Sequence, residues 1–296
     1  MKQYLGAFLL ASVLVWPVSA ARAGQAQQDQ NQKPAQGATG AQAGHANQAA
    51  PAAPAPPSPD ETKTYNGIQS EMDPDRQLAA VEDFAKKYPN SVYLSDVYFF
   101  GAYASQQQGK IPQVIEYGTK SLQANPNNLR SLLTMAGMLP QPQDLQGSDA
   151  DKEKKLADAE TYANKALQLI ADLKQPNLTP DKLTQLKATL TSQVHGSLGM
   201  VHLQRAMAGL TTADPNELAK AEQEYKAAVT GTTQANPEDY FLLGEVYENE
   251  KKIDEAIDAF TQASKLGQGT PIQSYADQQV DKLKKEKAQA PPPAKP

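Results

Sequence analysis

The chain has 296 residues, with 28 basic and 33 acidic side chains, a formal net charge of −5 at pH 7 and no cysteine. The absence of cysteine excludes disulfide bonds, thiolate metal sites and thiol nucleophiles. Nucleic-acid binding requires a concentrated basic face, and the mildly acidic composition therefore argues against a nucleic-acid partner.

The first 23 residues have the organisation of a secretory signal peptide. Lys2 is followed by an apolar run from Leu5 to Trp16, and small residues precede a cleavage site after Ala23. The run is shorter than the roughly 20 residues that cross a bilayer, although an uncleaved membrane anchor is the alternative. A bacterial lipoprotein would need a cysteine at this site. We therefore expect an exported protein, periplasmic or secreted, that is not a lipoprotein and has no membrane span after cleavage.

Residues 24–60 are predicted to be a disordered tether. This segment is dominated by Ala, Gln and Pro and contains no Leu, Ile, Val, Met, Phe, Tyr or Trp. Such a composition offers no apolar surface to offset the entropy lost on folding. The proline-rich residues 290–296 are predicted to be a second disordered segment, which leaves residues 61–289 as the folded domain.

Residues 61–289 are predicted to be all-α, with about eleven helices. Apolar residues recur three and four positions apart, and no stretch alternates with a period of two. A capping side chain stands before a proline at three predicted helix starts, Thr179-Pro180, Asp214-Pro215 and Asn236-Pro237. Proline is tolerated at the first helical position because the N–H that it lacks would have no partner there.

Residues 239–260 have the spacing of a helix–turn–helix repeat. They follow the pattern W-x2-L-G-x2-Y…A-x3-F with Tyr240, Leu243, Gly244, Tyr247, Ala256 and Phe260. The stretch resembles a tetratricopeptide repeat, in which small residues stand where two antiparallel helices cross and bulky residues fill the space around the crossing. The resemblance implies an α-solenoid of stacked antiparallel helix pairs that forms a right-handed superhelix.

Three further units fit the repeat more loosely, so that the resemblance covers approximately residues 95–267. One spans residues 99–126, a second resumes after an insertion at residues 156–170, and a third contains an extension of ten residues before residues 218–229. A solenoid tolerates such insertions because each repeat contacts only its neighbours. The packing residues predicted in these units are Ala102, Ala159, Ala166, Gly199, Ala221 and Tyr225. Residues 76–91 resemble the second helix of a half repeat.

The sequence contains no pattern that favours catalysis, a metal or a cofactor. Glu245 and Glu248 are three apart on one helix, but acid–base catalysis requires a buried pair beside a reacting group. His195 and His202 are seven apart, about 10 Å along a helix, which is too far for one metal ion. Residues 149–160 space their carboxylates like a calcium loop but have lysine where the turn requires glycine, so we interpret them as a helix start. We predict no enzyme activity and no cofactor.

The resemblance implies that the first helix of each pair lines a concave groove that binds an extended peptide or a helix. The residues predicted to face this groove are Phe99, Tyr103, Gln106, Gln107, Arg130, Leu133, Met200, Gln204, Phe241, Glu245 and Glu248. Burial between helices is the alternative for Phe99, Leu133 and Phe241. The Lys and Asn that hold a partner's terminal carboxylate in some cytosolic members are absent from the matching positions, which argues against that type of adaptor.

We therefore predict a non-catalytic scaffold or adaptor of a bacterial cell envelope that captures a peptide or helix of another protein on its concave face. One alternative is a structural subunit of an envelope or outer-membrane assembly complex that uses lateral packing. A second alternative is an enzyme of an unrecognised type.

Overall fold

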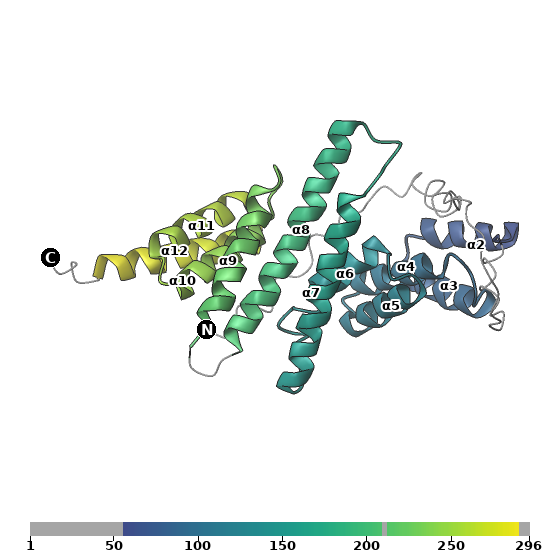
Figure 1. The fold of residues 1–296 in the computed structure, drawn as a ribbon, viewed down its shortest axis with the longest axis horizontal. Helices are drawn as coiled ribbons and strands as arrows, with labels where there is room; N and C mark the ends of the chain where they lie inside the picture. The colour runs from purple at the N-terminus through teal and green to yellow at the C-terminus, as the bar shows by residue number, and fades with distance from the viewer. Residues whose placement is uncertain (1–55, 209–211, 290–296) are drawn as a thin grey trace, which may run out of the picture.

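The computed structural model describes residues 56–208 and 212–289, which form eleven α-helices and contain no strand (Figure 1). The predicted all-α class is therefore confirmed. The predicted signal peptide, the tail at residues 290–296 and nearly all of the predicted tether lie outside the described residues. The helices are α2 (Pro59–Ser70), α3 (Pro74–Lys87), α4 (Leu94–Gln107), α5 (Ile111–Ala124), α6 (Leu129–Met138), α7 (Asp149–Ala171), α8 (Pro180–Met207), α9 (Pro215–Thr230), α10 (Pro237–Asn249), α11 (Ile253–Leu266) and α12 (Pro271–Gln289).

The helical region begins slightly earlier than the predicted boundary at residue 61. The side chain of Ser58 caps α2 by accepting from the Glu61 N–H, and the side chain of Glu61 accepts from the Ser58 N–H. Pro59 and Asp60 therefore already belong to the helix. Because α2 packs against α3 and α4, the predicted half repeat at residues 76–91 has a first helix after all. Local capping chemistry decides this boundary, not the composition of the preceding segment.

The three predicted helix starts are confirmed. Thr179, Asp214 and Asn236 are the N-caps of α8, α9 and α10, and each side chain accepts a hydrogen bond from a backbone N–H of the first turn. None of the helices in residues 56–208 and 212–289 combines the length and apolar character that crossing a membrane requires.

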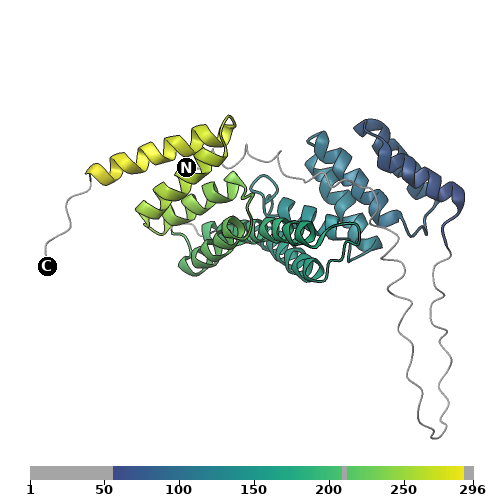
Figure 2. The same cartoon turned by 90° about the horizontal axis from the view of Figure 1, so that it is seen from above.

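The helices form a solenoid. Helices that share substantial contacts are one or two apart in chain order, and each contact between helices two apart joins two even-numbered helices. The even-numbered helices therefore crowd together on the inner side of the array, and we call α4, α6, α8 and α10 the inner helices. Figure 2 shows the resulting arc, with α2 at one end and α12 at the other.

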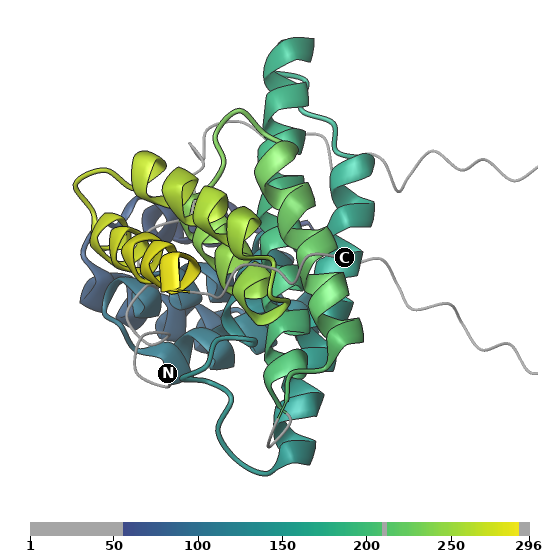
Figure 3. The ribbon, with the colours of Figure 1, turned by 90° about the vertical axis from the view of Figure 1, so that its left-hand side faces the viewer.

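The two central helices are longer than the rest. α7 has 23 residues and α8 has 28, so α8 projects beyond one edge of the array and α7 beyond the other (Figure 1). Figure 3 shows α7, α8 and α9 standing side by side, with α10, α11 and α12 inclined to them. The predicted repeat with the ten-residue extension thus uses only the second half of α8 as its first helix.

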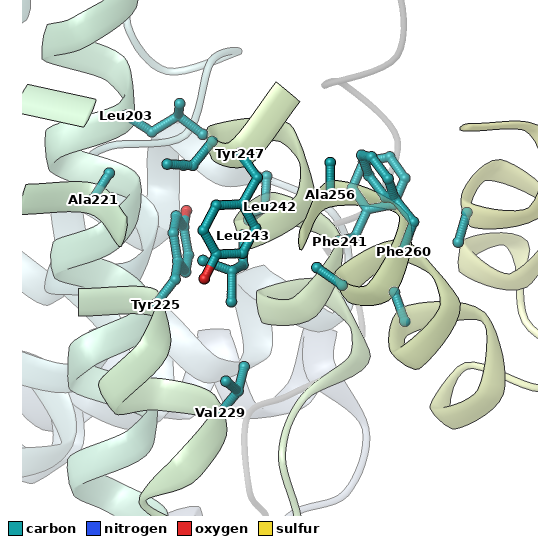
Figure 4. Close-up of a cluster of buried hydrophobic side chains, with 14 of the residues drawn as sticks. Leu203, Ala221, Tyr225, Val229, Phe241, Leu242, Leu243, Tyr247, Ala256 and Phe260 are labelled. Carbon is teal, nitrogen blue, oxygen red and sulfur yellow. The ribbon is translucent and has the colours of Figure 1, made fainter. Parts of the chain in front are cut away.

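Three of the helix crossings place a glycine against an aromatic ring, and two of them involve glycines that the sequence predicted. A methyl group on Gly244 of α10 would lie 2.8 Å from the ring of Phe260 in α11, and one on Gly199 of α8 would lie 2.8 Å from the ring of Tyr225 in α9. Both rings are fully buried and lie in the cluster drawn in Figure 4. Phe260 follows Gly244 by 16 positions and Tyr225 follows Gly199 by 26, so the predicted ten-residue extension leaves the crossing unchanged.

The α4/α5 crossing differs from the predicted one. Its glycine is Gly101, where a methyl group would lie 2.9 Å from the ring of Tyr117, whereas the predicted residue was the neighbouring Ala102. The remaining predicted packing residues are also buried, except that Tyr240 keeps part of its side chain exposed. The buried set is Ala102, Ala159, Ala166, Ala221, Leu243, Tyr247 and Ala256.

Candidate binding cleft

A cleft of about 530 Å³ lies among the inner helices, mainly between α6, α8 and α10. A volume of this size falls within the range of small-ligand pockets. Its walls combine apolar, amide, hydroxyl and carboxyl side chains. The lining residues are Gln106, Leu133, Thr134, Gly137, Met138, Gln141, Thr189, Ser192, Gln193, Gly196, Ser197, Met200, Gln234, Ala235, Asn236, Pro237, Glu238, Asp239 and Leu242. None of them is Lys, Arg or His.

The N-terminus of α10 places two carboxyl groups in this cleft. Asn236 caps the helix by accepting from the Glu238 N–H at 3.1 Å, and Pro237 occupies the first turn. Asp239 is 8% exposed and lies against Gly196 of α8, where an added methyl group would be 2.6 Å from the Asp239 Oδ1. The glycine in the middle of α8 thus gives this carboxyl its place between the two helices.

The hydroxyl groups of the cleft donate hydrogen bonds to groups within the protein. Each of the four donates to a backbone carbonyl: Thr134 to Arg130 at 2.9 Å, Thr189 to Gln185 at 3.0 Å, Ser192 to Ala228 at 2.6 Å and Ser197 to Gln193 at 3.2 Å. A hydroxyl that donates once still has its oxygen free to accept. The amide of Gln141 likewise donates to the Gly137 carbonyl at 2.9 Å, which leaves its Oε1 as an acceptor.

Burial perturbs the two carboxyl groups. Burial and the neighbouring Glu238 raise the pKa of Asp239 to about 8. Burial raises the pKa of Glu238 to about 7, although the hydrogen bond with Asn236 opposes this rise. The positive end of the α10 dipole favours the ionised forms, but the loss of water outweighs it. Both groups therefore titrate near neutral pH.

The structure brings three of the predicted groove residues to the cleft, namely Gln106, Leu133 and Met200. Leu133 and Met200 contribute edges only, because they are 9% and 4% exposed and belong to the hydrophobic core. The prediction is wrong for Phe99 and Phe241, which are 8% and 6% exposed and pack between helices. These aromatic side chains belong to the hydrophobic core and do not face a groove.

Three other predicted groove residues are held by contacts inside the protein. Arg130 binds the Asp96 Oδ1 at 3.0 Å and stacks on the ring of Phe99, with the guanidinium carbon 4.5 Å from the ring centre. Glu248 pairs with a lysine of α12, and Gln204 donates to the sulfur of Met200. The remaining three, Tyr103, Gln107 and Glu245, do not line the cleft.

Sequence reasoning did not single out Glu238 and Asp239. Acidic residues in the first turn of a helix are expected wherever the dipole favours them, so these two carried no distinguishing signal. The available signal was Gly196, since a glycine inside a helix costs about 1 kcal/mol relative to alanine and often marks a close approach. Its partner could be identified only from the tertiary structure.

The two histidines of α8 pair with acids of the next helix. His195 and Glu224 are joined by a 2.7 Å contact between Nδ1 and Oε2, and His202 and Glu217 by an equivalent one. Both pairs link α8 to α9. Within the two described segments there is no cluster of three or more His, Asp or Glu side chains suited to a metal ion.

No protein-family model and no curated protein sequence matches this chain. One similar solved structure is the assembly chaperone of RpL4 (Acl4), residues 1–338, with a TM-score of 0.55 and 12% identity over 77% of this chain and 85% of that one. Another is TTC0263, a thermophilic TPR protein of Thermus thermophilus, with a TM-score of 0.47 and 15% identity over 75% of this chain and 97% of that one. The helix pairs, their glycine crossings and the fold shared with the chaperone identify the architecture as a tetratricopeptide-like α-solenoid.

Proposed function

We propose that this protein is a non-catalytic interaction scaffold of a bacterial cell envelope, and that it captures a segment of a partner protein in the cleft between α6, α8 and α10. The observation that carries the proposal is the cleft itself, because three successive inner helices contribute to one concave site with polar and apolar walls. Such a surface exists before binding, so the main entropic cost falls on ordering the partner segment.

Filling the cleft should abolish capture. Gln193 is a half-buried lining residue of α8, and Gln193→Trp would place a large ring across the opening. We expect pull-down from envelope extract, quantified by mass spectrometry, to lose the proteins that the unmodified chain retains. Gln168→Trp is the matched control, since Gln168 is exposed on α7. If Gln193→Trp retains the same proteins as the control, capture uses another surface, as expected for a structural subunit that packs laterally.

Export is the second part of the proposal and rests on the residues at the start of the chain. Expressed in full in a Gram-negative host, the protein should lose its first 23 residues and accumulate in the periplasmic fraction with Gly24 at its N-terminus. Intact-mass measurement of the fractionated protein tests this directly. A chain that begins at Gly24 serves as the control and should stay in the cytoplasm. Recovery of the uncleaved chain from the membrane fraction would indicate an anchor instead.

A further inference from the structure

We propose that the cleft between α6, α8 and α10 is a recognition site for one basic side chain, lysine or arginine, presented by the captured segment, with Asp239 and Glu238 as its counter-ions. This inference rests on the proposed capture function and specifies its chemistry. It follows from the hydrogen-bonding groups of the cleft, its apolar walls and the position of one buried carboxyl.

The cleft presents hydroxyl, amide and carboxyl oxygens as acceptors, and its side-chain donors are the uncharged amides of Gln106, Gln141, Gln193, Gln234 and Asn236. Its four hydroxyl groups and the Gln141 amide donate to backbone carbonyls, which leaves their oxygens to accept. Two carboxyl groups add further acceptors, and no basic side chain stands among the lining residues. The lining therefore offers the two carboxyl groups no charged donor, and a ligand with a guanidinium or ammonium group would bring five or three donors.

Asp239 is the specific indication of a cationic ligand. Its side chain is 8% exposed and lines the cleft, yet no other described residue offers it a hydrogen bond or an opposite charge, since only burial and Glu238 perturb it. A buried polar group without a partner is unfavourable. A cation that entered the cleft would supply the missing partner and form a charge-assisted hydrogen bond, which is among the stronger kinds.

The apolar walls suit the stem of a long basic side chain. Leu133, Met138, Met200 and Leu242 line the same cleft. Lysine and arginine commonly place their methylene groups along apolar surface while the charged head reaches a polar partner. A small inorganic cation would use the carboxyl groups but would leave this apolar lining without a role, which favours a side chain.

Few other titratable groups surround Asp239. Glu238 is on its own helix, and α9 contributes Tyr225, whose pKa Asp239 helps to raise. On α8, His195 is next to Gly196 in sequence, but its ring contacts Glu224 of α9. From α11 and α12 no group perturbs Asp239; Lys282 of α12 pairs with Glu248. Because the pKa values of Asp239 and Glu238 are about 8 and about 7, binding of a cation at pH 7 should release protons from both groups.

The test compares arginine with its neutral isostere. Nα-acetyl-arginine methylamide and Nα-acetyl-lysine methylamide are titrated into the isotope-labelled full chain, and Nα-acetyl-citrulline methylamide serves as the matched probe without charge. We expect the two cationic probes to shift the NMR signals of the Asp239 carboxyl and the Gly196 amide, with affinity rising from pH 6 to pH 8.5. Citrulline binding as tightly as arginine, or putrescine binding more tightly than the lysine probe, would overturn the proposal.

Variants separate the site from the wider function. Asp239→Asn keeps the shape of the side chain and should weaken the arginine probe by at least about tenfold, whereas Glu255→Gln, at an exposed position of α11, should leave it unchanged. Equal affinity of both variants contradicts the proposal. If Gln193→Trp abolishes partner capture while Asp239→Asn leaves it intact, the capture function stands and the basic-side-chain inference fails. If the arginine probe binds but Gln193→Trp does not affect capture, the cleft binds a basic side chain and the proposed capture function fails.

Discussion

Gly244→Ala is expected to destabilise the protein by about 1–3 kcal/mol, although alanine is the better helix former. The new methyl group would lie 2.8 Å from the ring of Phe260, a distance at which one of the two groups must move. Phe260 cannot move easily, because it is fully buried and packs edge-on against Phe241 with ring centres 5.1 Å apart. α10 and α11 would have to separate instead, and that would disturb the core between them.

Gly67→Ala is the matched control. Gly67 is also inside a helix, α2, but nothing lies within 4 Å of the methyl position. The same chemical change should therefore stabilise the protein by up to about 1 kcal/mol through helix propensity alone. Urea unfolding followed by circular dichroism measures both variants. If the two changes alter the free energy of unfolding equally, the predicted steric clash between position 244 and Phe260 does not exist.

A double-mutant cycle can assign the loss to the ring. Phe260→Leu alone removes buried aromatic contacts and should also destabilise the protein. If the clash with Phe260 is the cause, Gly244→Ala should cost less in the Phe260→Leu background than in the unmodified chain, and the two effects will not add. Additive effects would place the strain elsewhere along α10.

The second large effect is a pH-dependent gain in stability from Asp239→Asn. The pKa of Asp239 is about 8 in the folded protein against an ordinary value of 3.8, so the folded state binds a proton that the unfolded state has released. The contribution of this group to stability is complete below about pH 4 and is lost as the pH rises through 8. Asparagine resembles the protonated carboxyl and does not titrate.

We expect the variant and the unmodified protein to differ little in stability near pH 4. As the pH rises from 5.5 to 9 the variant should gain on the unmodified protein by an amount on the order of 3 kcal/mol, because the unmodified chain must then either bury a charge or retain a proton at a cost. Thermal or urea unfolding across this pH range gives the difference curve. Taking the difference between two chains cancels the titration of the shared groups that do not interact with Asp239, and Glu238 is the exception because its charge acts on Asp239.

Asp258→Asn provides the control for this measurement. Asp258 is exposed on α11, so the stability of this variant should differ little from that of the unmodified chain. An Asp239→Asn variant that is less stable than the unmodified protein at every pH would show that the carboxyl is ionised and partnered in the folded state. That result would also remove the main support for a cationic ligand.

The class of this fold and the positions of its tight helix crossings can be predicted from local sequence patterns. Periodicity and the caps at Thr179, Asp214 and Asn236 predicted the helices, because a cap acts within a few residues of its own position. The pattern of small and aromatic residues predicted the crossing of Gly244 with Phe260, since the repeat fixes both positions on adjacent helices. These interactions are local or repeat with the sequence, so they can be read from one chain.

Which side chains face the cleft depends on how the helices pack against one another. Burial depends on neighbours that other helices supply, so Phe99 and Phe241 proved to be core residues and Arg130 proved to be paired with Asp96. For the same reason the sequence shows Asp239 only as an acid in the first turn of a helix. The close approach of α8 at Gly196, which shields Asp239 from water, is visible only in the structure. The sequence predicts where each helix begins and which of its residues are small or aromatic. The packing of α6, α8 and α10 determines which side chains line the cleft, because desolvation is a property of the assembled array.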